Sequence, residues 1–211
     1  MLIAAVVALL AVSVNASSED YIIEEEFANV TCGSGIKLQH KSTSFRLHSH
    51  AIAYGTGSQQ NSVTGFPKGD DPNSVFVVHE AFGEKPCKRG TPFRCGSTIR
   101  LKHLETKRFL HSHMHESPLS KQQEVSCFSD TTSDGGDNWK VICLASGDTT
   151  WKREKDIRLQ HVDTGKYICS SKSFQFRHPI PGQLEVAASV KANGDTVWTV
   201  QEGIFFSSES N

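Results

Sequence analysis

The hydrophobic and polar positions of this chain form a pattern that occurs three times. Five residues in the order apolar, basic, Leu, polar, His stand at 36–40, 99–103 and 157–161. In every copy a Thr follows three places after the His, and another apolar residue follows seven places after it. An aromatic-x-Val triplet lies about 40 residues beyond the start of each copy. Such regular spacing indicates an internal repeat, which has to be recognised before a fold is assigned.

Within each repeat, apolar residues alternate with polar ones at a period of two residues, which is typical of half-buried β-strands. Clusters of Gly, Asn, Ser and Asp separate these segments and indicate turns. No 3.6-residue helical period is present. Four strands are therefore predicted in each repeat, at 36–40, 45–50, 61–66 and 74–79, then at 98–104, 109–113, 124–128 and 139–144, and finally at 157–161, 167–170, 184–188 and 197–201.

Repeats of about 55 residues are too small to hold separate hydrophobic cores, so the three must share one. We predict a single domain over 32–206, with repeats at about 32–81, 92–144 and 153–203. Open strand edges would risk aggregation, and closure around a threefold axis removes them. The predicted fold is therefore all-β, a β-trefoil; a β-propeller, which typically has at least four blades, is disfavoured. Its core layers would contain Leu38, Leu101 and Leu159; Leu47, Leu110 and Ile168; Phe76, Trp139 and Trp198.

The formal net charge is −1, with basic and acidic residues interspersed. This balance provides no extended field for nucleic acid or an anionic membrane, so neither is a predicted partner. Residues 1–14 form the only long apolar run, shorter than the about 20 residues that span a bilayer. Small residues precede position 17, so 1–16 is predicted to be a secretory signal peptide rather than a membrane insertion; a retained anchor is the alternative.

The segments on either side of the repeats carry little apolar pattern. Residues 17–31 are rich in acids and are predicted to be a solvated lead-in, and 207–211 a free tail. Asn29-Val30-Thr31 is a glycosylation sequon, so Asn29 is a predicted glycan acceptor in a chain that enters the secretory pathway.

The six cysteines would meet an oxidising compartment, in which disulfides are stable. If the first and last strands of a repeat pair antiparallel, Cys95 lies beside Cys143, and by analogy Cys32 lies beside Cys87. Six cysteines allow 15 connectivities, and a short loop closed by Cys87 and Cys95 is the main rival. The cysteines without counterparts in the other repeats are predicted to be unpaired, small buried residues: Cys127 and Cys169.

The most specific polar feature is Leu-His-Ser-His, at 47–50 and again at 110–113; the third repeat reads Ile-Cys-Ser-Ser at 168–171. Alternate residues of a strand face the same side, so each motif presents a pair of imidazoles. Structural hydrogen bonding, ligand or sugar contact and metal binding are the possible roles. No metal is predicted, because no Cys, Asp or Glu recurs at a fixed offset to complete a ligand set. The candidate ligand or partner contacts are Leu47, His48, Ser49, His50, Leu110, His111, Ser112 and His113.

The histidine that ends the first strand recurs in all three repeats, as His40, His103 and His161, each with its following Thr. A residue needed by every repeat is expected to hold a turn rather than carry out a unique reaction. We therefore predict a structural role for these three histidines.

The sequence is poor in groups for catalysis. It contains no Gly-x-Ser-x-Gly elbow, no phosphate-cradling loop and no His-Glu-x-x-His motif. Its acids are scattered, mostly in predicted loops. A binding protein without enzymatic activity and without a cofactor is therefore predicted.

At these motifs the chain resembles proteins with MIR repeats, a β-trefoil module shared by protein O-mannosyltransferases, inositol trisphosphate receptors and the stromal-cell-derived factor 2 family. It is most similar to the last, whose soluble members consist of a signal peptide and one MIR trefoil. The resemblance covers the predicted mature chain and rests on residues 30–34, 46–50, 54–65, 110–113 and 124–126.

The resemblance implies a non-enzymatic protein of folding quality control in the endoplasmic reticulum lumen. Its implied partners are a lumenal J-domain co-chaperone, an Hsp70 chaperone and unfolded clients, with O-mannosyl glycans as a further ligand. The Leu-His-Ser-His strands are the implied contact sites. Many relatives end in a His-Asp-Glu-Leu-like retrieval tail, whereas this chain ends Ser-Ser-Glu-Ser-Asn, so both retention through a partner and secretion are expected.

Two other functions stay open. The resemblance to O-mannosyltransferases covers only their accessory module, so an accessory or catalytic role in O-mannosylation is one alternative. A secreted trefoil lectin is the other, and it is less favoured because no Gln-x-Trp signature stands near Trp139 or Trp198.

Overall fold

The computed structural model describes residues 22–208, and the predicted signal peptide, the start of the lead-in and the last three residues lie outside them. The described chain is all-β, as predicted, and no helix within it has the length and apolar composition to cross a lipid bilayer. The strands are β1 (Gly35–His40), β2 (Arg46–Ala53), β3 (Asn61–Phe66), β4 (Phe76–Glu80), β5 (Thr98–His103), β6 (Phe109–Glu116), β7 (Gln123–Phe128), β8 (Trp139–Cys143), β9 (Ile157–His161), β10 (Tyr167–Gln175), β11 (Leu184–Ser189) and β12 (Trp198–Ile204). Single 3₁₀ turns are η1 (Glu25–Phe27), η2 (Pro72–Ser74), η3 (Gly135–Asp137) and η4 (Gly194–Thr196).

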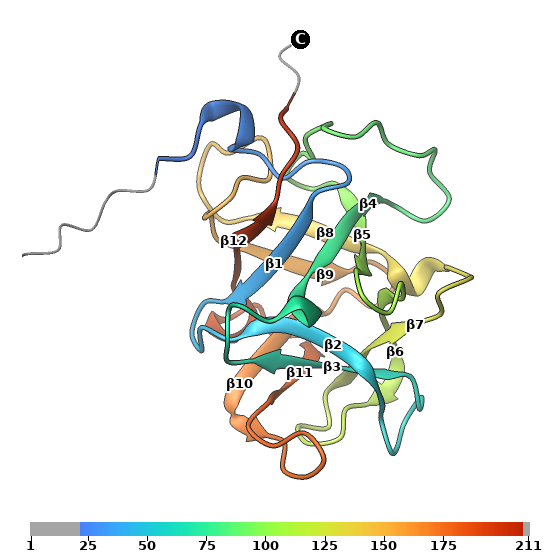
Figure 1. Ribbon diagram of the computed structural model, residues 1–211. Coiled ribbons are helices and arrows are strands. Elements are labelled where there is room, and N and C mark those ends of the chain that lie inside the picture. The colour runs from blue at the N-terminus through green and yellow to red at the C-terminus, as the bar shows by residue number, and fades with distance from the viewer. Residues whose placement is uncertain (1–21, 209–211) are drawn as a thin grey trace, which may run out of the picture.

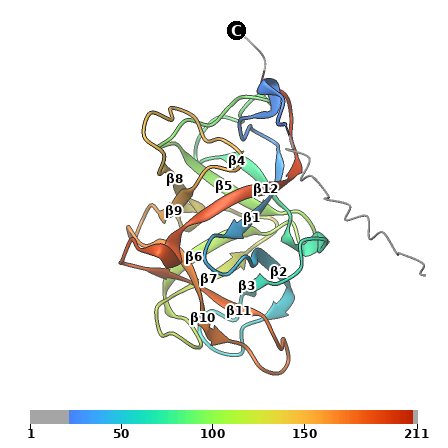
Figure 2. The ribbon, with the colours of Figure 1, turned by 90° about the vertical axis from the view of Figure 1, so that its left-hand side faces the viewer.

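Six of the strands close into a barrel and the other six form three hairpins. The barrel ring runs β1, β12, β9, β8, β5, β4 and back to β1, every pair antiparallel. The hairpins β2–β3, β6–β7 and β10–β11 lie below the barrel in Figure 1 and pair with one another through β3, β7 and β11. Figure 2 shows the same two layers from the side. This is the predicted β-trefoil.

The core forms where the sequence pattern places it. All nine residues of the predicted layers are at most 1% exposed. Two of them are tryptophans whose indole N–H groups donate to backbone carbonyls, Trp139 to Leu110 at 3.0 Å and Trp198 to Ile168 at 3.1 Å. Neither buried indole is therefore left without a partner.

The second strand of each repeat is longer than predicted. β2, β6 and β10 continue to Ala53, Glu116 and Gln175, because ladder pairing resumes beyond an irregularity in each hairpin. The fourth strand of the first repeat is shorter at its start, since 72–74 forms the turn η2 instead of extended chain.

The end of the predicted lead-in belongs to the fold. Val30, Phe93 and Trp151 close a ring of backbone hydrogen bonds, from Val30 N–H to Trp151, from Trp151 N–H to Phe93 and from Phe93 N–H to Val30, at 2.8, 2.8 and 3.1 Å. Val30 and Trp151 are fully buried. The prediction of a solvated segment over 17–31 is therefore wrong for its last residues, because Val30 is buried and is the third member of this hydrogen-bonded ring.

The same burial affects the predicted glycan acceptor. The Asn29 side chain accepts a hydrogen bond from Thr150 Oγ1 at 2.7 Å, and the Thr31 hydroxyl is buried against Ser34 and the Phe206 carbonyl. A glycan would have to be attached before the barrel closes. Modification of Asn29 stays a prediction.

Each first-strand histidine links two repeats. Its Nδ1 lies 2.9 Å from the Thr hydroxyl of its own turn, and its Nε2 lies 2.8 to 3.1 Å from a backbone carbonyl of the preceding repeat. A carbonyl only accepts, so Nε2 carries the proton and Nδ1 accepts from Thr. The pairs are His40 with Asp195, His103 with Asn73 and His161 with Gly136. Burial lowers the pKa of all three rings, which favours this neutral form.

Two disulfides secure the loops around the barrel. Cys32 is bonded to Cys87 and Cys95 to Cys143, as predicted, and the rival pairing of Cys87 with Cys95 is wrong. Both bonds fit a chain that matures in an oxidising compartment. The unpaired thiols of Cys127 and Cys169 are buried, also as predicted.

Replacing one of the linking histidines should destabilise the whole domain. His161→Ala leaves the Gly136 carbonyl without its donor and opens a cavity beside Trp139, so we expect the free energy of unfolding to fall by about 3 kcal/mol. Urea denaturation followed by tryptophan fluorescence measures this loss. The control His115→Ala removes an exposed imidazole and should change stability by less than about 0.5 kcal/mol; equal effects of the two would contradict the structural role of His161.

Candidate functional site

The candidate site lies on β2 and β6, which carry the two Leu-His-Ser-His motifs. Leu47 and Leu110 are fully buried in the core, and the Ser49 and Ser112 hydroxyls donate to the carbonyls of Ser62 and Glu124. Leu47, Leu110 and Ser49 are fully buried, so the prediction that they contact a ligand is wrong, because alternate residues of each strand point into the trefoil. Ser112 lines the cavity beside β6, and its role as a contact stays a prediction.

His48 is tied to the turn η2. Its Nδ1–H donates to Asp71 Oδ2 at 2.7 Å, and the same oxygen accepts from the Ser74 hydroxyl at 2.9 Å. The ring stacks on Phe66 with centroids 4.8 Å apart. Burial lowers the pKa of His48 to about 4, which outweighs the opposing effect of the hydrogen bond to Asp71. His48 is therefore a neutral, buried support.

His50 is more exposed than His48. Its Nδ1 accepts from the Ile52 backbone N–H at 3.2 Å, so the proton of the neutral ring is on Nε2. That Nε2 is buried and has no hydrogen-bond partner among the described residues. Burial lowers the pKa of His50, so the ring is neutral at physiological pH.

His111 makes the equivalent contact with η3. Its Nδ1–H donates to Asp137 Oδ1 at 2.9 Å, and Asp134 Oδ1 lies 3.6 Å away. Gly136 permits this approach, because a Cβ there would lie 2.3 Å from His111 Cε1. The ring packs on Phe128 with centroids 4.9 Å apart, as His48 packs on Phe66.

His113 takes part in a contact between repeats. Its Nε2 donates to Glu124 Oε1 at 3.0 Å, and this fully buried carboxylate also accepts from the Ser58 hydroxyl of the first repeat. Burial alone would raise the pKa of Glu124, but the hydrogen bonds from His113 and Ser58 lower it. Gly57 makes room for the carboxylate, since its φ is +69° and a Cβ there would lie 2.1 Å from Glu124 Oε2.

A cavity of about 370 Å³ opens beside the histidines of the second repeat. Its polar walls come from β6, from η3 and from the turn after β9, and the exposed Met114 stands at its edge. The residues that give it its chemistry are His111, His113, Asp134, His161 and Asp163. This combination of imidazoles and carboxylates suits hydrogen bonding to a polar ligand or to a peptide.

Three side chains beside this cavity form a cluster that resembles a metal site. One atom each of His111, Asp134 and Asp137 lie within 4.8 Å of one another. Both carboxylates are already engaged, Asp134 by the Gly136 N–H and Asp137 by the Ser133 hydroxyl and the Asp134 N–H. These contacts close the η3 turn as a capping box, which explains the convergence, and we assign no cation to it.

Sequence reasoning missed the acids of this site. Asp71, Glu124 and Asp137 stand 23, 11 and 26 residues from the histidines they bind. The register of the hairpin β6–β7 places Glu124 opposite His113, whereas the fold of the whole repeat brings Asp71 to His48 and Asp137 to His111. A usable signal existed for two of them. Asp71 and Asp137 lie in the turn just before an aromatic-x-Val triplet, which the repeat had already located.

The chain is similar to known proteins in sequence and in fold. A family model described as MIR domain matches residues 42–156. A stromal cell-derived factor 2-like protein of Arabidopsis thaliana is 46% identical over 182 residues, covering 86% of this chain and 82% of that protein. The crystal structure of the SDF2-like protein from Arabidopsis thaliana superimposes with a TM-score of 0.82 at 45% identity, covering 86% of this chain and 99% of that one.

A second solved structure resembles the chain as part of a larger protein. The S. cerevisiae protein O-mannosyltransferase Pmt1-Pmt2 complex bound to the sugar donor matches with a TM-score of 0.73 at 28% identity, over 92% of this chain and 29% of that one. The match covers only a minor part of that transferase.

The fold and the repeated histidine strands define a MIR-domain protein with a β-trefoil architecture. Within that class, the chain belongs to the stromal cell-derived factor 2 family, which confirms the resemblance found in its sequence.

Glu124 offers a direct test of the contact between repeats. Glu124→Gln puts an amide N–H where the carboxylate accepts hydrogen bonds, so we expect a loss of about 1–3 kcal/mol in stability and a changed environment at Gly57. Urea denaturation measures the first effect and the amide NMR shift of Gly57 the second. Glu116→Gln, an exposed change on β6, is the control; a Gly57 shift that responds equally to both variants would contradict the contact.

Proposed function

We propose that this chain is a non-enzymatic protein of folding quality control in the endoplasmic reticulum lumen. It binds a lumenal J-domain co-chaperone, an Hsp70 chaperone and unfolded clients. Its membership of the stromal cell-derived factor 2 family, the predicted signal peptide and two disulfides support this proposal.

Buried thiols support the non-enzymatic part of the proposal. Cys127 and Cys169 are the only free cysteines of the described residues, and burial raises the pKa of each to about 12. Both are therefore protonated near neutral pH and poor nucleophiles, since the thiolate is the reactive form. A cysteine–histidine mechanism is thus disfavoured.

The observation that carries the proposal is the open, polar cavity beside β6. His113 is held by Glu124 at 3.0 Å and His111 by Asp137 at 2.9 Å, so the imidazoles that line it have fixed orientations. A rigid strand with oriented hydrogen-bonding groups is suited to recognition, because little freedom is lost on binding. Exposed Met114 at the edge of the cavity adds an adaptable apolar contact for a polypeptide.

The experiment uses purified chain, Hsp70 and J-domain co-chaperone with a denatured client whose aggregation is followed by light scattering. The wild type should form a complex with the chaperones and suppress aggregation. His50→Ala/His113→Ala should weaken the complex at least tenfold while circular dichroism stays unchanged. Lys172→Ala, an exposed change on β10, is the control and should bind as the wild type does.

Two results would count against the proposal. A folded wild type that neither binds these chaperones nor suppresses aggregation would remove the quality-control role. A folded double variant with unchanged affinity would remove His50 and His113 from the contact surface.

A second candidate function, an accessory role in protein O-mannosylation, is favoured by the match to the transferase complex. In this case the histidine strands would contact mannosylated polypeptides. A mannosyl-transfer assay with a transferase, with and without this chain, distinguishes the two: the quality-control proposal expects no change in transfer. A glycan array tests the remaining alternative, a secreted trefoil lectin.

A further inference from the structure

The third repeat has a cavity where the other two repeats place an aromatic pair. Strand register fixes the correspondence: Ser189 pairs with Tyr167 as Phe66 pairs with Arg46, and Cys169 pairs with Ala187 as His48 pairs with Thr64. The third repeat therefore has Cys and Ser at the positions of His48 and Phe66.

The first two repeats fill these positions with stacked or tilted rings. His48 and Phe66 lie 4.8 Å apart between centroids, and His111 and Phe128 lie 4.9 Å apart. In two of the three repeats, the space between the hairpin and the following 3₁₀ turn therefore holds two flat rings.

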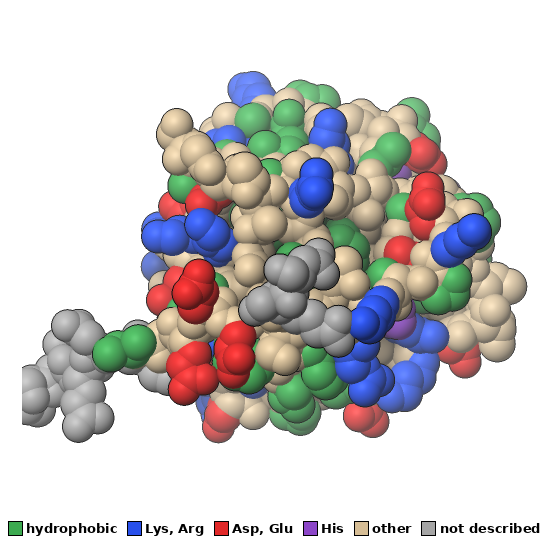
Figure 3. All heavy atoms as spheres, turned by 90° about the horizontal axis from the view of Figure 1, so that it is seen from above, with side chains coloured by type: hydrophobic (Ala, Val, Ile, Leu, Met, Phe, Trp, Pro, Cys, Tyr) green, Lys and Arg blue, Asp and Glu red, His purple; other side chains and the backbone are tan. Residues whose placement is uncertain are grey.

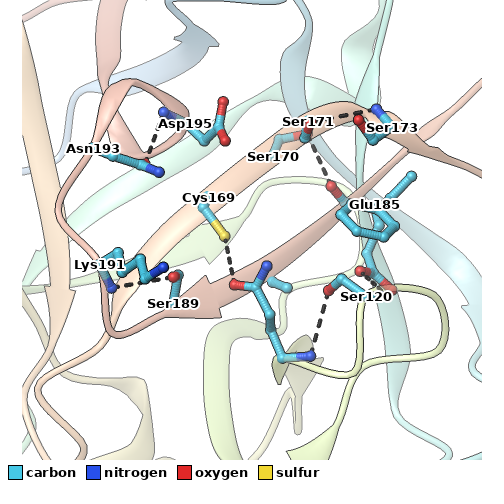
Figure 4. A pocket seen from close by; sticks show the side chains of 13 residues that line it. Ser120, Cys169, Ser170, Ser171, Ser173, Glu185, Ser189, Lys191, Asn193 and Asp195 are labelled. Carbon is cyan, nitrogen blue, oxygen red and sulfur yellow. Dashed lines mark hydrogen bonds between the residues drawn. The ribbon is translucent and has the colours of Figure 1, made fainter.

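Without those rings, a cavity of about 330 Å³ remains between β10, β11 and η4 (Figure 4). This is at the small end of ligand pockets, which span about 300–1,000 Å³. It includes Ser189, whereas the cavity beside His111 does not include Phe128. The third-repeat cavity shares wall positions with the cavity beside His111, and it extends further, to the side where the missing Phe ring would be.

The walls suit a ring with a hydrogen-bond donor. In the first two repeats the histidine donates to a carboxylate of the turn, Asp71 or Asp137. In the third, Asp195 stands at the position of Asn73 and Gly136, and its carboxylate lines the cavity and accepts no hydrogen bond from the described residues. The backbone N–H of Asp195 is held by Asn193. The Phe174 ring is a further apolar wall.

The charged residues around the cavity leave Asp195 as the carboxylate available to such a donor. Glu185, the other carboxylate in the wall, is occupied by the backbone N–H groups of Leu119 and Ser120 at 2.6 and 2.9 Å. Lys191 is exposed at the rim. Asp195 is thus the acceptor that a donor on the incoming ring would meet.

We propose that the third-repeat cavity binds one aromatic side chain of a partner polypeptide, with Tyr preferred because its hydroxyl donates to Asp195. This deepens the proposed function by naming a group that clients or chaperone partners would present. It does not depend on the histidine strands, and it is tested without any chaperone.

The experiment is an NMR titration of the full chain with acetylated, amidated peptides of sequence Gly-Ser-Xaa-Ser-Gly. Tyr at Xaa should shift the amide signals of Ser171, Ser189 and Asn193, Phe should bind several-fold more weakly, and Leu or Ala should cause no shift. Asp195→Asn should reduce the advantage of Tyr over Phe.

Filling the cavity is the decisive variant. Cys169→His/Ser189→Phe installs the pair of the sister repeats, so it should reduce Tyr-peptide binding at least tenfold while the melting temperature is kept or raised. Ser189→Phe alone serves if the double variant does not fold. Val190→Phe adds the same ring at an exposed neighbour outside the cavity and should leave binding unchanged.

Three outcomes would overturn the proposal: no shift with any aromatic peptide up to its solubility limit, a folded filled variant that binds as the wild type does, or shifts with methyl α-mannoside but with no aromatic peptide. Because only peptides and purified chain are used, these results are distinct from a failure of the chaperone assay.

Discussion

One imidazole bridge, used three times, holds the trefoil together. In each copy a buried histidine accepts a hydrogen bond from the Thr of its own repeat and donates one to a carbonyl of the preceding repeat. The carbonyls belong to Asn73, Gly136 and Asp195, which lie in the turns η2, η3 and η4. The bridges therefore close a cycle, and loss of any one leaves a half-buried carbonyl without its donor.

These turns also position the candidate site. η2 carries Ser74 and follows Asp71, which holds His48, and η3 carries Asp137, which holds His111. Each turn is thus contacted on one side by a linking histidine. On its other side lies a site histidine or, in the third repeat, the cysteine that replaces it. The linking histidines fix the positions of the turns, and the turns hold the site histidines. This explains why the site histidines have fixed orientations.

With the backbone fixed, side chains at equivalent positions can differ without altering the fold. His48 and His111 are replaced by Cys169, and Phe66 and Phe128 by Ser189, yet the register of the hairpin is kept. The consequence is a cavity in one repeat and packed rings in the others. The face seen from above mixes acidic, basic and apolar side chains (Figure 3).

The repeat made the fold predictable, because it located the strands, the core layers and the disulfides from spacing alone. The ring of Val30, Phe93 and Trp151 was missed, although each stands six residues before the first Ile of its repeat, since single residues outside an alternating segment carry no period. The site acids could not be predicted for another reason. Glu124 lies opposite His113 within the hairpin β6–β7, but it meets Ser58 only after two hairpins pack together, and sequence spacing does not encode that second contact.

The account depends most on the protonation state of the linking histidines, and an NMR titration of their ring nitrogens from pH 7.5 to 5 measures it directly. Burial lowers the pKa of His40, His103 and His161, so each ring should take up a proton only below the ordinary histidine pKa of about 6.5, and its neutral form should carry the proton on Nε2. Histidines of the unfolded chain have a pKa of about 6.5. The free energy of unfolding should therefore be constant above that pH and fall as the pH drops below it. Protonation of any of the three rings at pH 6.5 or above, or a proton on Nδ1 in the neutral form, would contradict the bridge.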